Sequence, residues 1–207
     1  MSKLPCFKAY DIRGKVPEDL NEGIAYKVGR AFVEELNAAI VVVGYDIRLE
    51  SEALANALKK GITNAGCNVI DIGLCGTEEV YFNTFHQKTD GGIMITASHN
   101  PKGYNGMKLV AKGSKPISGD SGLQSIEQSV IKAEFNETKQ PGQIRESYSK
   151  VDYIAHLMTY VDQANLKSLN IVMNAGNGSA ACVIKGIANQ LPFECVFVHD
   201  VPDGHFP

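Results

Sequence analysis

The chain lacks several features that would place it in a specialised class of protein. A membrane-spanning helix needs about 18 consecutive apolar residues, and the longest apolar run, 38–43, has only the length of a strand. The N-terminus has no hydrophobic signal core. Lys and Arg total 20 against 23 Asp and Glu, so the surface has no strong attraction for nucleic acid or anionic membranes. We therefore expect a cytoplasmic protein that binds neither, and that recognises any phosphate through a local site.

Cysteine is also scarce and scattered. The chain has five cysteines, an odd number, and no C-x-x-C pair. This pattern argues against a disulfide framework and against a structural zinc site. The prediction is reduced thiols that are mostly buried.

Apolar residues make up 44% of the chain, enough for a sizeable core. Strand-like and helix-like patterns alternate up to Ala133. Repeated β-α-β units favour an α/β fold, here a mixed, largely parallel sheet sandwiched by helices. The expected strands are 40–43, 69–72, 92–96 and 105–110, and Gly44 is expected to end the first of them. The expected helices are 21–36, one that runs from an N-cap at Ser51 to Gly66, one that is capped by Thr77, and 119–133.

Composition changes over 136–150, which is polar and contains Pro-Gly. We interpret this segment as a domain boundary, with one domain over 1–145 and the start of a second over 146–207. The second part has only two predicted strands, 169–173 and 193–198, and two strands rarely make an independent sheet. We expect an incomplete second α/β domain in a fragment of a longer protein, with an open apolar face or sheet edge. Either disorder after about residue 146 or self-association that covers this edge should follow.

The most unusual segment is Thr96-Ala-Ser98-His99-Asn-Pro101, which directly follows an apolar strand. Ligands of open parallel sheets bind beyond the carboxyl ends of strands, so Ser98 could act as a nucleophile or carry a phosphoryl group. A phosphoserine has about −1.5 to −2 charges, which nearby lysines or a metal must offset. Hydrolysis is disfavoured, because neighbouring side chains on extended backbone point apart and no G-x-S-x-G elbow is present. Taken alone, the segment also fits an ordinary capped loop.

Two Asp-x-Arg patterns stand at strand ends. In the first, over 10–14, Arg13 can present a bidentate fork to phosphate, although the pattern by itself favours an Asp-Arg ion pair at a strand edge. In the second, we interpret Asp46 and Arg48 as bracing the loop rather than binding a ligand.

The segment 176–181 fits the pattern G-x-G-x-x-A between a predicted strand and a predicted helix. Dinucleotide-binding sites have this arrangement, and Asp200 after the next strand could serve as the acid that binds a ribose. Such glycine-rich turns are also common in α/β folds without a dinucleotide. A dinucleotide-dependent oxidoreductase using Gly176 and Gly178 is therefore an alternative.

Several segments together resemble the α-D-phosphohexomutase family, in that family's order and from about residue 6 to the last residue. The serine segment 96–101, followed by Tyr-Asn-Gly-Met-Lys at 104–108, is similar to that family's active-site serine loop. Further resemblance, partly to the phosphomannomutase branch, lies in 7–14 (Phe-Lys-Ala-Tyr-Asp-Ile-Arg-Gly), 76–82, 116–119, 174–178 and 202–207.

This resemblance implies an activity. In the family, a phosphate on the loop serine, here Ser98, passes to a hexose monophosphate, and the bound 1,6-bisphosphate reorients and returns its other phosphate. The net reaction would interconvert mannose 6-phosphate and mannose 1-phosphate, with the glucose pair as a second substrate. The implied site has His99 orienting the phosphoserine, Arg13 and Lys108 as cations, Lys108 also moving a proton, and Tyr10 beside the sugar. Ser98, as phosphoserine, would be a ligand of Mg²⁺.

The family's other metal ligands lie on a D-G-D-x-D-R loop, and no such string occurs here. Its sugar-choosing and phosphate-binding loops belong to further domains. We therefore expect the full-length protein to be a phosphomannomutase whose C-terminal domains complete the site. The 207-residue piece should turn over little or nothing. A non-catalytic sugar-phosphate-binding module is a further alternative.

Overall fold

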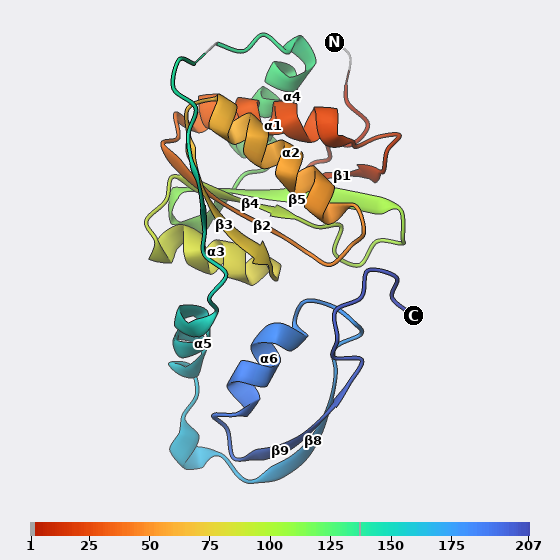
Figure 1. The fold of residues 1–207 in the computed structure, drawn as a ribbon, viewed down its shortest axis with the longest axis vertical. Coiled ribbons are helices and arrows are strands. Elements are labelled where there is room, and N and C mark those ends of the chain that lie inside the picture. The colour runs from red at the N-terminus through yellow and green to blue at the C-terminus, as the bar shows by residue number, and fades with distance from the viewer. Residues whose placement is uncertain (1–2, 137) are drawn as a thin grey trace.

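The computed structural model describes residues 3–136 and 138–207 and shows a larger N-terminal part joined to a smaller C-terminal one (Figure 1). The larger part contains β1 (Ile12–Lys15), α1 (Glu22–Leu36), β2 (Ile40–Tyr45), α2 (Ser51–Asn64), β3 (Asn68–Leu74), α3 (Thr77–His86), β4 (Gly91–Ile95), β5 (Tyr104–Ala111), β6 (Lys115–Pro116), α4 (Leu123–Lys132) and β7 (Ile144–Glu146). The smaller part contains α5 (Val151–Met158), β8 (Leu169–Asn174), α6 (Ala181–Ala188) and β9 (Phe193–Val198). Short 3-10 turns lie at Lys112–Ser114, Gly119–Ser121 and Gln163–Asn165.

The large sheet has the strand order β1-β5-β4-β2-β3-β7, with β6 paired to β5. Strands β4, β2, β3 and β7 run parallel, whereas β5 lies antiparallel between β4 and β1. The prediction of a mixed, largely parallel α/β sheet between helices is confirmed. The antiparallel β5 returns the chain directly beside β4, so that the serine loop is the connection between two neighbouring strands.

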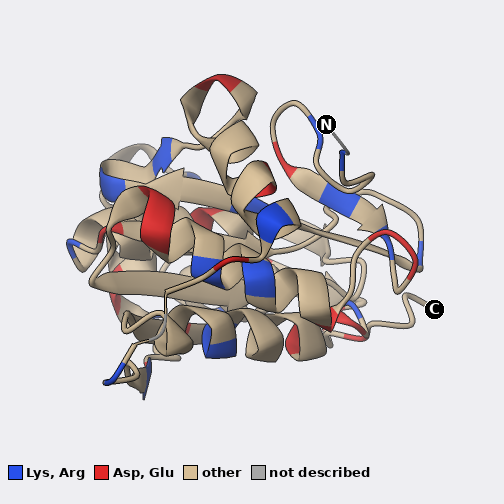
Figure 2. Ribbon diagram, turned by 90° about the horizontal axis from the view of Figure 1, so that it is seen from above, with Lys and Arg blue, Asp and Glu red and all other residues tan. Residues whose placement is uncertain are grey.

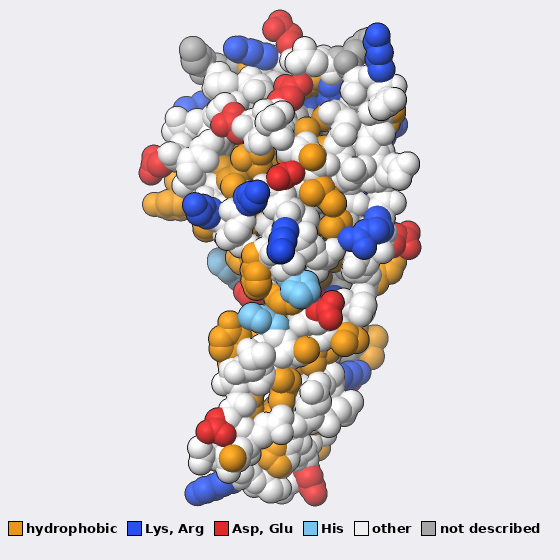
Figure 3. Space-filling view, turned by 90° about the vertical axis from the view of Figure 1, so that its left-hand side faces the viewer, with side chains coloured by type: hydrophobic (Ala, Val, Ile, Leu, Met, Phe, Trp, Pro, Cys, Tyr) orange, Lys and Arg blue, Asp and Glu red, His pale blue; other side chains and the backbone are white. Residues whose placement is uncertain are grey.

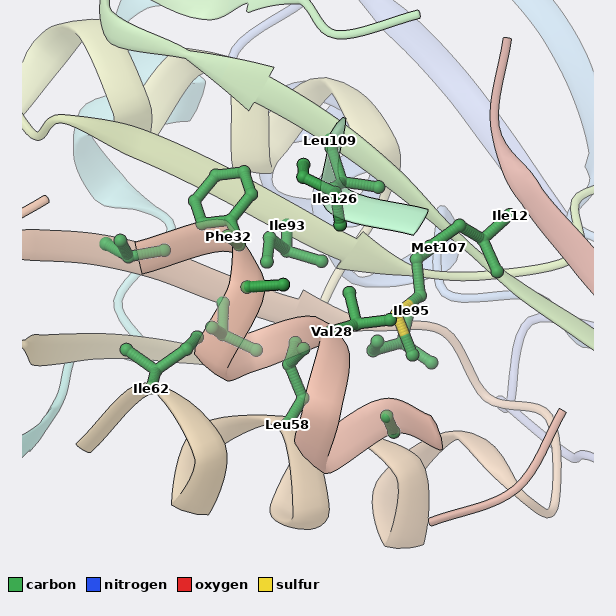
Figure 4. Packing of buried hydrophobic residues seen from close by; sticks show 14 of the residues in the cluster. Ile12, Val28, Phe32, Leu58, Ile62, Ile93, Ile95, Met107, Leu109 and Ile126 are labelled. Carbon is green, nitrogen blue, oxygen red and sulfur yellow. The ribbon is translucent and has the colours of Figure 1, made fainter. Parts of the chain in front are cut away.

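Helices cover both faces of this sheet (Figure 1). The larger core cluster joins α1, α2 and α4 to one face and includes Phe32, Leu58 and Ile126 (Figure 4). The smaller cluster lies under α3 and contains Val42 and Val80. Because side chains alternate along a strand, β2 supplies Val41 and Val43 to the first cluster and Val42 to the second. Burial on both faces explains its continuous β-branched sequence.

Two predictions about Gly44 and the segment 119–133 are wrong. Gly44 lies inside β2 and does not end it; a Cβ there would collide with the Cys75 sulfur, so the glycine serves close packing. The segment 119–133 is split at Gly122, whose φ of 115° is a conformation that a helix interior excludes. Only the part from Leu123 onward is α-helical.

Neither predicted N-cap is a cap. Ser51 is the first residue of α2, and its hydroxyl donates instead to Asp46 Oδ1 at 2.5 Å. Thr77 is the first residue of α3, and the N-cap is Gly76, whose N–H donates to Glu79 Oε1 at 2.8 Å. Each helix therefore begins one residue earlier than predicted.

The segment predicted to separate two domains contributes a strand to the first sheet. β7 pairs in parallel with β3, from Val69 opposite Ile144 to Asp71 opposite Glu146. The chain then continues into α5, and the Lys150 ammonium donates to Glu79 and to the Leu74 carbonyl. A division into 1–145 and 146–207 stays a prediction.

The C-terminal part is a two-stranded parallel sheet in which β8 pairs with β9. Helix α6 is the crossover connection from β8 to β9. Val172 and Val196 stand directly opposite each other and are 70% and 61% exposed. The expected open apolar face is therefore present. At the narrow waist between the two parts, visible in Figure 3, Phe82 of α3 stacks on His86 of the same helix and contacts His156 of α5, with ring centroids 4.6 and 5.0 Å apart.

Charged residues of both signs are interspersed over the surface (Figure 2). No helix in the described ranges is both long and apolar enough to cross a bilayer.

Candidate functional site

Ser98 lies on the loop that leaves the carboxyl end of β4. It is exposed, and its φ of 52° is a left-handed conformation uncommon for a residue with a side chain. Its N–H donates to the Thr96 hydroxyl at 2.8 Å, and its Oγ lies 3.4 Å from His99 Nδ1. The hydroxyl is thus open to solvent on a loop whose backbone is held in a strained form.

Arg13 and Lys108 share one carboxylate. Lys108 Nζ lies 3.3 Å from one oxygen of Asp11, and an Arg13 guanidinium nitrogen lies 3.8 Å from the other. Arg13 on β1 is opposite Gly106 on β5, two residues before Lys108, so both cations project from the same face of the sheet.

Gly106 ties this cationic face to the serine loop. Its carbonyl accepts a hydrogen bond from the Thr96 N–H at 2.9 Å. A Cβ at Gly106 would collide with the Ile12 carbonyl oxygen, so only glycine permits this approach of β1, β5 and the loop. Lys108 lies on β5, the strand that the loop enters, and Arg13 lies on the neighbouring β1; each is about one third exposed.

The remaining predicted site residues are exposed. Tyr10 is 79% exposed in the turn before β1, and His99 is exposed beside Ser98. His99 is therefore accessible to a ligand that binds at the loop.

The interpretation of Asp46 and Arg48 as a brace is confirmed. Arg48 is buried, and its Nε lies 3.6 Å from Asp46 Oδ2. Its terminal nitrogens donate to main-chain carbonyls of the serine loop, among them that of Ser98 at 2.8 Å. The Asp-x-Arg pattern indicated a brace, but not that it supports a loop 50 positions further along.

A pocket of about 200 Å³ opens beside Ser98. One wall comes from the ends of β2, β3 and β4, and the other from Gly178, Ser179 and Phe206 in the C-terminal part. The Ser179 hydroxyl donates to the Cys75 carbonyl at 2.9 Å and closes this side. Sequence reasoning did not identify these three C-terminal residues as lining the site. The place of Gly178 in the family-like segment 174–178 and of Phe206 in 202–207 could have indicated two of them, and Ser179 lies directly after the first segment.

The glycine-rich turn does follow β8 and precede α6, as a dinucleotide motif requires. Asp200, however, accepts a hydrogen bond from Lys185 at 2.5 Å, and this contact lowers the pKa of its carboxyl. This contact uses part of the carboxylate's capacity to accept hydrogen bonds. The turn instead forms a wall of the Ser98 pocket, which disfavours the oxidoreductase alternative.

The described residues do not by themselves form a magnesium site. Nowhere in 3–136 or 138–207 do three His, Cys, Asp or Glu side chains gather around a position that a metal ion could occupy. Asp46, the carboxylate in the pocket, already accepts hydrogen bonds from Ser51 and Thr96. Mg²⁺ takes six oxygen ligands in near-octahedral geometry, and Ser98, as phosphoserine, would supply one of them.

Comparison with known proteins identifies the family. Residues 5–137 match the family described as "Phosphoglucomutase/phosphomannomutase, alpha/beta/alpha domain I". The chain is 51% identical, over its whole length, to a protein named "Phosphomannomutase" from Salmonella typhimurium and 47% identical to one of that name from Vibrio cholerae, covering 47% of each. The chain thus spans about half the length of these curated relatives.

Solved structures agree with this assignment. A phosphoglucomutase/phosphomannomutase family protein from Burkholderia thailandensis superposes with a TM-score of 0.90 at 32% identity, and the match covers all of this chain and 46% of that one. A putative phosphomannomutase from Thermus thermophilus shares the fold, with a TM-score of 0.85 at 24% identity over all of this chain and 48% of that one. The chain belongs to the phosphoglucomutase/phosphomannomutase family.

Proposed function

We propose that the full-length protein containing this chain is a phosphomannomutase, an intramolecular phosphotransferase that interconverts mannose 6-phosphate and mannose 1-phosphate, with the glucose pair as a second substrate. The observation that carries this proposal is the exposed Ser98 hydroxyl on a braced loop at a strand end, in a chain whose relatives at about 50% identity are named phosphomannomutases. The five free cysteines support a cytoplasmic location, where thiols stay reduced.

The proposed reaction begins with a phosphate on Ser98. A free hydroxyl of the hexose monophosphate attacks the phosphorus, the bond to Ser98 Oγ breaks, and a bound hexose 1,6-bisphosphate forms. This intermediate then reorients in the site. Ser98 Oγ attacks its other phosphate, which regenerates the phosphoserine and releases the isomeric monophosphate. Phosphoryl transfer depends mainly on positioning and charge neutralisation, so a single serine can serve both ends of the sugar.

The neighbouring side chains take roles that match their positions. Arg13 and Lys108 supply positive charge on the face next to the loop, and Lys108 relays the proton of the attacking hydroxyl by passing one of its own protons to Asp11 as it accepts it. His99, 3.4 Å from the serine oxygen, orients the phosphoserine. Tyr10 borders the sugar.

Mg²⁺, when bound, would neutralise charge on the phosphoserine. Phosphoserine oxygens alone would hold it weakly, because the described residues add no cluster of ligands. We therefore propose that the C-terminal domains complete the metal and sugar sites, and that this chain by itself turns over little or no sugar phosphate.

The test is Ser98→Ala in the full-length protein. Mutase turnover should fall at least ~10²-fold, since the residue that forms the covalent intermediate is removed. Ser114→Ala is a matched control, because Ser114 also has a positive φ, of 60°, but lies at the opposite end of β5. Intact-mass analysis should find one added phosphoryl group that maps to Ser98.

Wild-type turnover in Ser98→Ala would contradict the mechanism. Efficient turnover by the purified 207-residue chain would contradict the proposal that further domains complete the site.

A further inference from the structure

Arg48 directs nearly all of its donors at the backbone of the serine loop. Its Nη1 donates to the carbonyls of Pro101 and Tyr104 at 3.0 and 3.1 Å. Its Nη2 donates to those of Ser98 and Asn100 at 2.8 and 2.5 Å. The side chain is only 8% exposed, so these four carbonyls have a buried charged donor in place of water.

Asp46, the ion-pair partner of Arg48, holds the amide side of Ser98 through Thr96. The Ser98 N–H donates to Thr96 Oγ1 at 2.8 Å, and the Thr96 hydroxyl donates to Asp46 Oδ2 at 2.7 Å. Asp46 Oδ2 in turn lies 3.6 Å from Arg48 Nε. A closed ring therefore runs from the Ser98 carbonyl through Arg48, Asp46 and Thr96 back to the Ser98 amide.

This ring accounts for the conformation of the serine. A left-handed backbone at a non-glycine residue costs about 1–3 kcal/mol and persists only where surrounding contacts determine it. In Ser98, whose φ is 52°, the main-chain N–H and the main-chain carbonyl are both hydrogen-bonded within one network. If the residue relaxed to negative φ, at least one of these bonds would break and the hydroxyl would point elsewhere.

We propose that Arg48 is the positioning residue for the phosphate-carrying serine. It acts through the loop's main chain and not on the substrate, and this proposal rests on the function proposed above. Lysine cannot replace it, because one ammonium with three donors cannot reach carbonyls arranged around a planar fork. The centre of the Phe206 ring lies 5.9 Å from the guanidinium carbon of Arg48. Arg48 therefore links the C-terminal part to the serine loop.

A first experiment measures the loop without reference to catalysis. Amide hydrogen exchange is compared between the 207-residue chain and its Arg48→Lys variant. Exchange at Ser98 and Asn100, whose amides bond to Thr96 and Ala97, should accelerate about tenfold or more, as loss of one to two hydrogen bonds predicts. Unchanged protection of these amides would overturn the proposal.

The matched control is Arg30→Lys. Arg30 is also 8% exposed and donates to a carbonyl, that of Asn136, but it lies on α1 away from the loop. It should leave exchange at Ser98 and Asn100 unchanged, and equal acceleration in both variants would count against a specific role. If Arg48→Lys does not fold, Thr96→Val breaks the ring without stranding a buried charge and should show the same acceleration.

A second experiment uses the full-length enzyme. Arg48→Lys should lower kcat at least ~10-fold while KM for the sugar phosphate stays within about twofold, because the hydrogen bonds of Arg48 go to the main chain of the serine loop. Arg30→Lys should change neither constant. The ³¹P resonance of phosphorylated Ser98 should shift or broaden in Arg48→Lys alone.

The two proposals fail separately. If Ser98→Ala abolishes turnover and Arg48→Lys leaves kcat unchanged, the positioning role is wrong and the function stands. If the wild-type enzyme shows no mutase activity while Arg48→Lys loosens the loop, the function is wrong and the role of Arg48 in holding Ser98 stands.

Discussion

Burial sets the chemistry of individual thiols in this chain. All five cysteines are free, and Cys6, Cys67 and Cys75 are buried, as the sequence predicted. Burial disfavours the thiolate, so it raises the pKa of Cys6 to about 11 and that of Cys67 to about 12, and raises the pKa of Cys75 as well. Cys182 is exposed and Cys195 is partly exposed.

Alkylation should therefore divide the thiols into two classes. With iodoacetamide at pH 8, peptide mapping should find Cys182 labelled first and Cys195 more slowly, and the three buried thiols unlabelled until the chain unfolds. The raised pKa values also favour the folded state below pH 9.0, the ordinary thiol value, and this contribution declines as pH rises from 9.0 toward 11–12. Early labelling of Cys67, or a free energy of unfolding that rises over that pH interval, would contradict these assignments.

At the scale of the elements, glycines allow the backbones of α1 and α2 to pack in contact. A Cβ on Gly29 would lie 2.5 Å from the Leu58 carbonyl oxygen, and a Cβ on Gly61 would collide with the Tyr26 carbonyl oxygen. The helix backbones thus lie in direct contact over the first core cluster, whose side chains Val28, Leu58 and Ile62 are shown in Figure 4. This close packing lets both helices cover the same face of the sheet.

Gly61→Ala should destabilise the chain by about 1–3 kcal/mol, because the added methyl group forces the helices apart. Gly23→Ala is the control, since Gly23 is also helical but exposed, and alanine there should be neutral or stabilising by up to about 1 kcal/mol. Urea unfolding midpoints of the two variants provide the comparison. Equal midpoints would show that the helices can separate without cost.

At the scale of the whole molecule, the hydrophobic core is unevenly distributed. Both core clusters found in the described residues come from the N-terminal part, between Cys6 and Val130. In the C-terminal part only Ala181, Val183 and Ala188 are buried apolar residues. A two-stranded sheet with so little buried surface is marginal in water, so we expect it to acquire further packing from another chain or segment.

We therefore predict that the 207-residue chain self-associates through the face that contains Val172 and Val196. The double variant Val172→Lys with Val196→Glu keeps a favourable cross-strand pair but removes the apolar surface. Light scattering should show less association at equal protein concentration. Val201→Lys, at a residue 67% exposed outside the strands, should behave as the wild type. Identical association in all three proteins would place the contact elsewhere.

Much of the architecture could be predicted because its causes are local. Periodicity predicted α1 to within one residue and β9 without error, since both patterns depend on which side chains face a core. Successive side chains of a strand point to opposite faces of the sheet, and both faces are covered here. The continuous apolar run 40–43 therefore predicts a buried strand. Ser98 stood out because its segment follows such a strand.

Only the tertiary structure decided what holds Ser98. The sheet order places β5 between β4 and β1, and this order puts Arg13 and Lys108 on neighbouring strands, the second of which the serine loop enters. It also brings Arg48 to carbonyls about 50 positions away. Periodicity reports which face of an element is buried, but not which element lies beside it. The sequence therefore determined the strands, the helices and the candidate serine, whereas its strained conformation and its neighbours depend on long-range pairing.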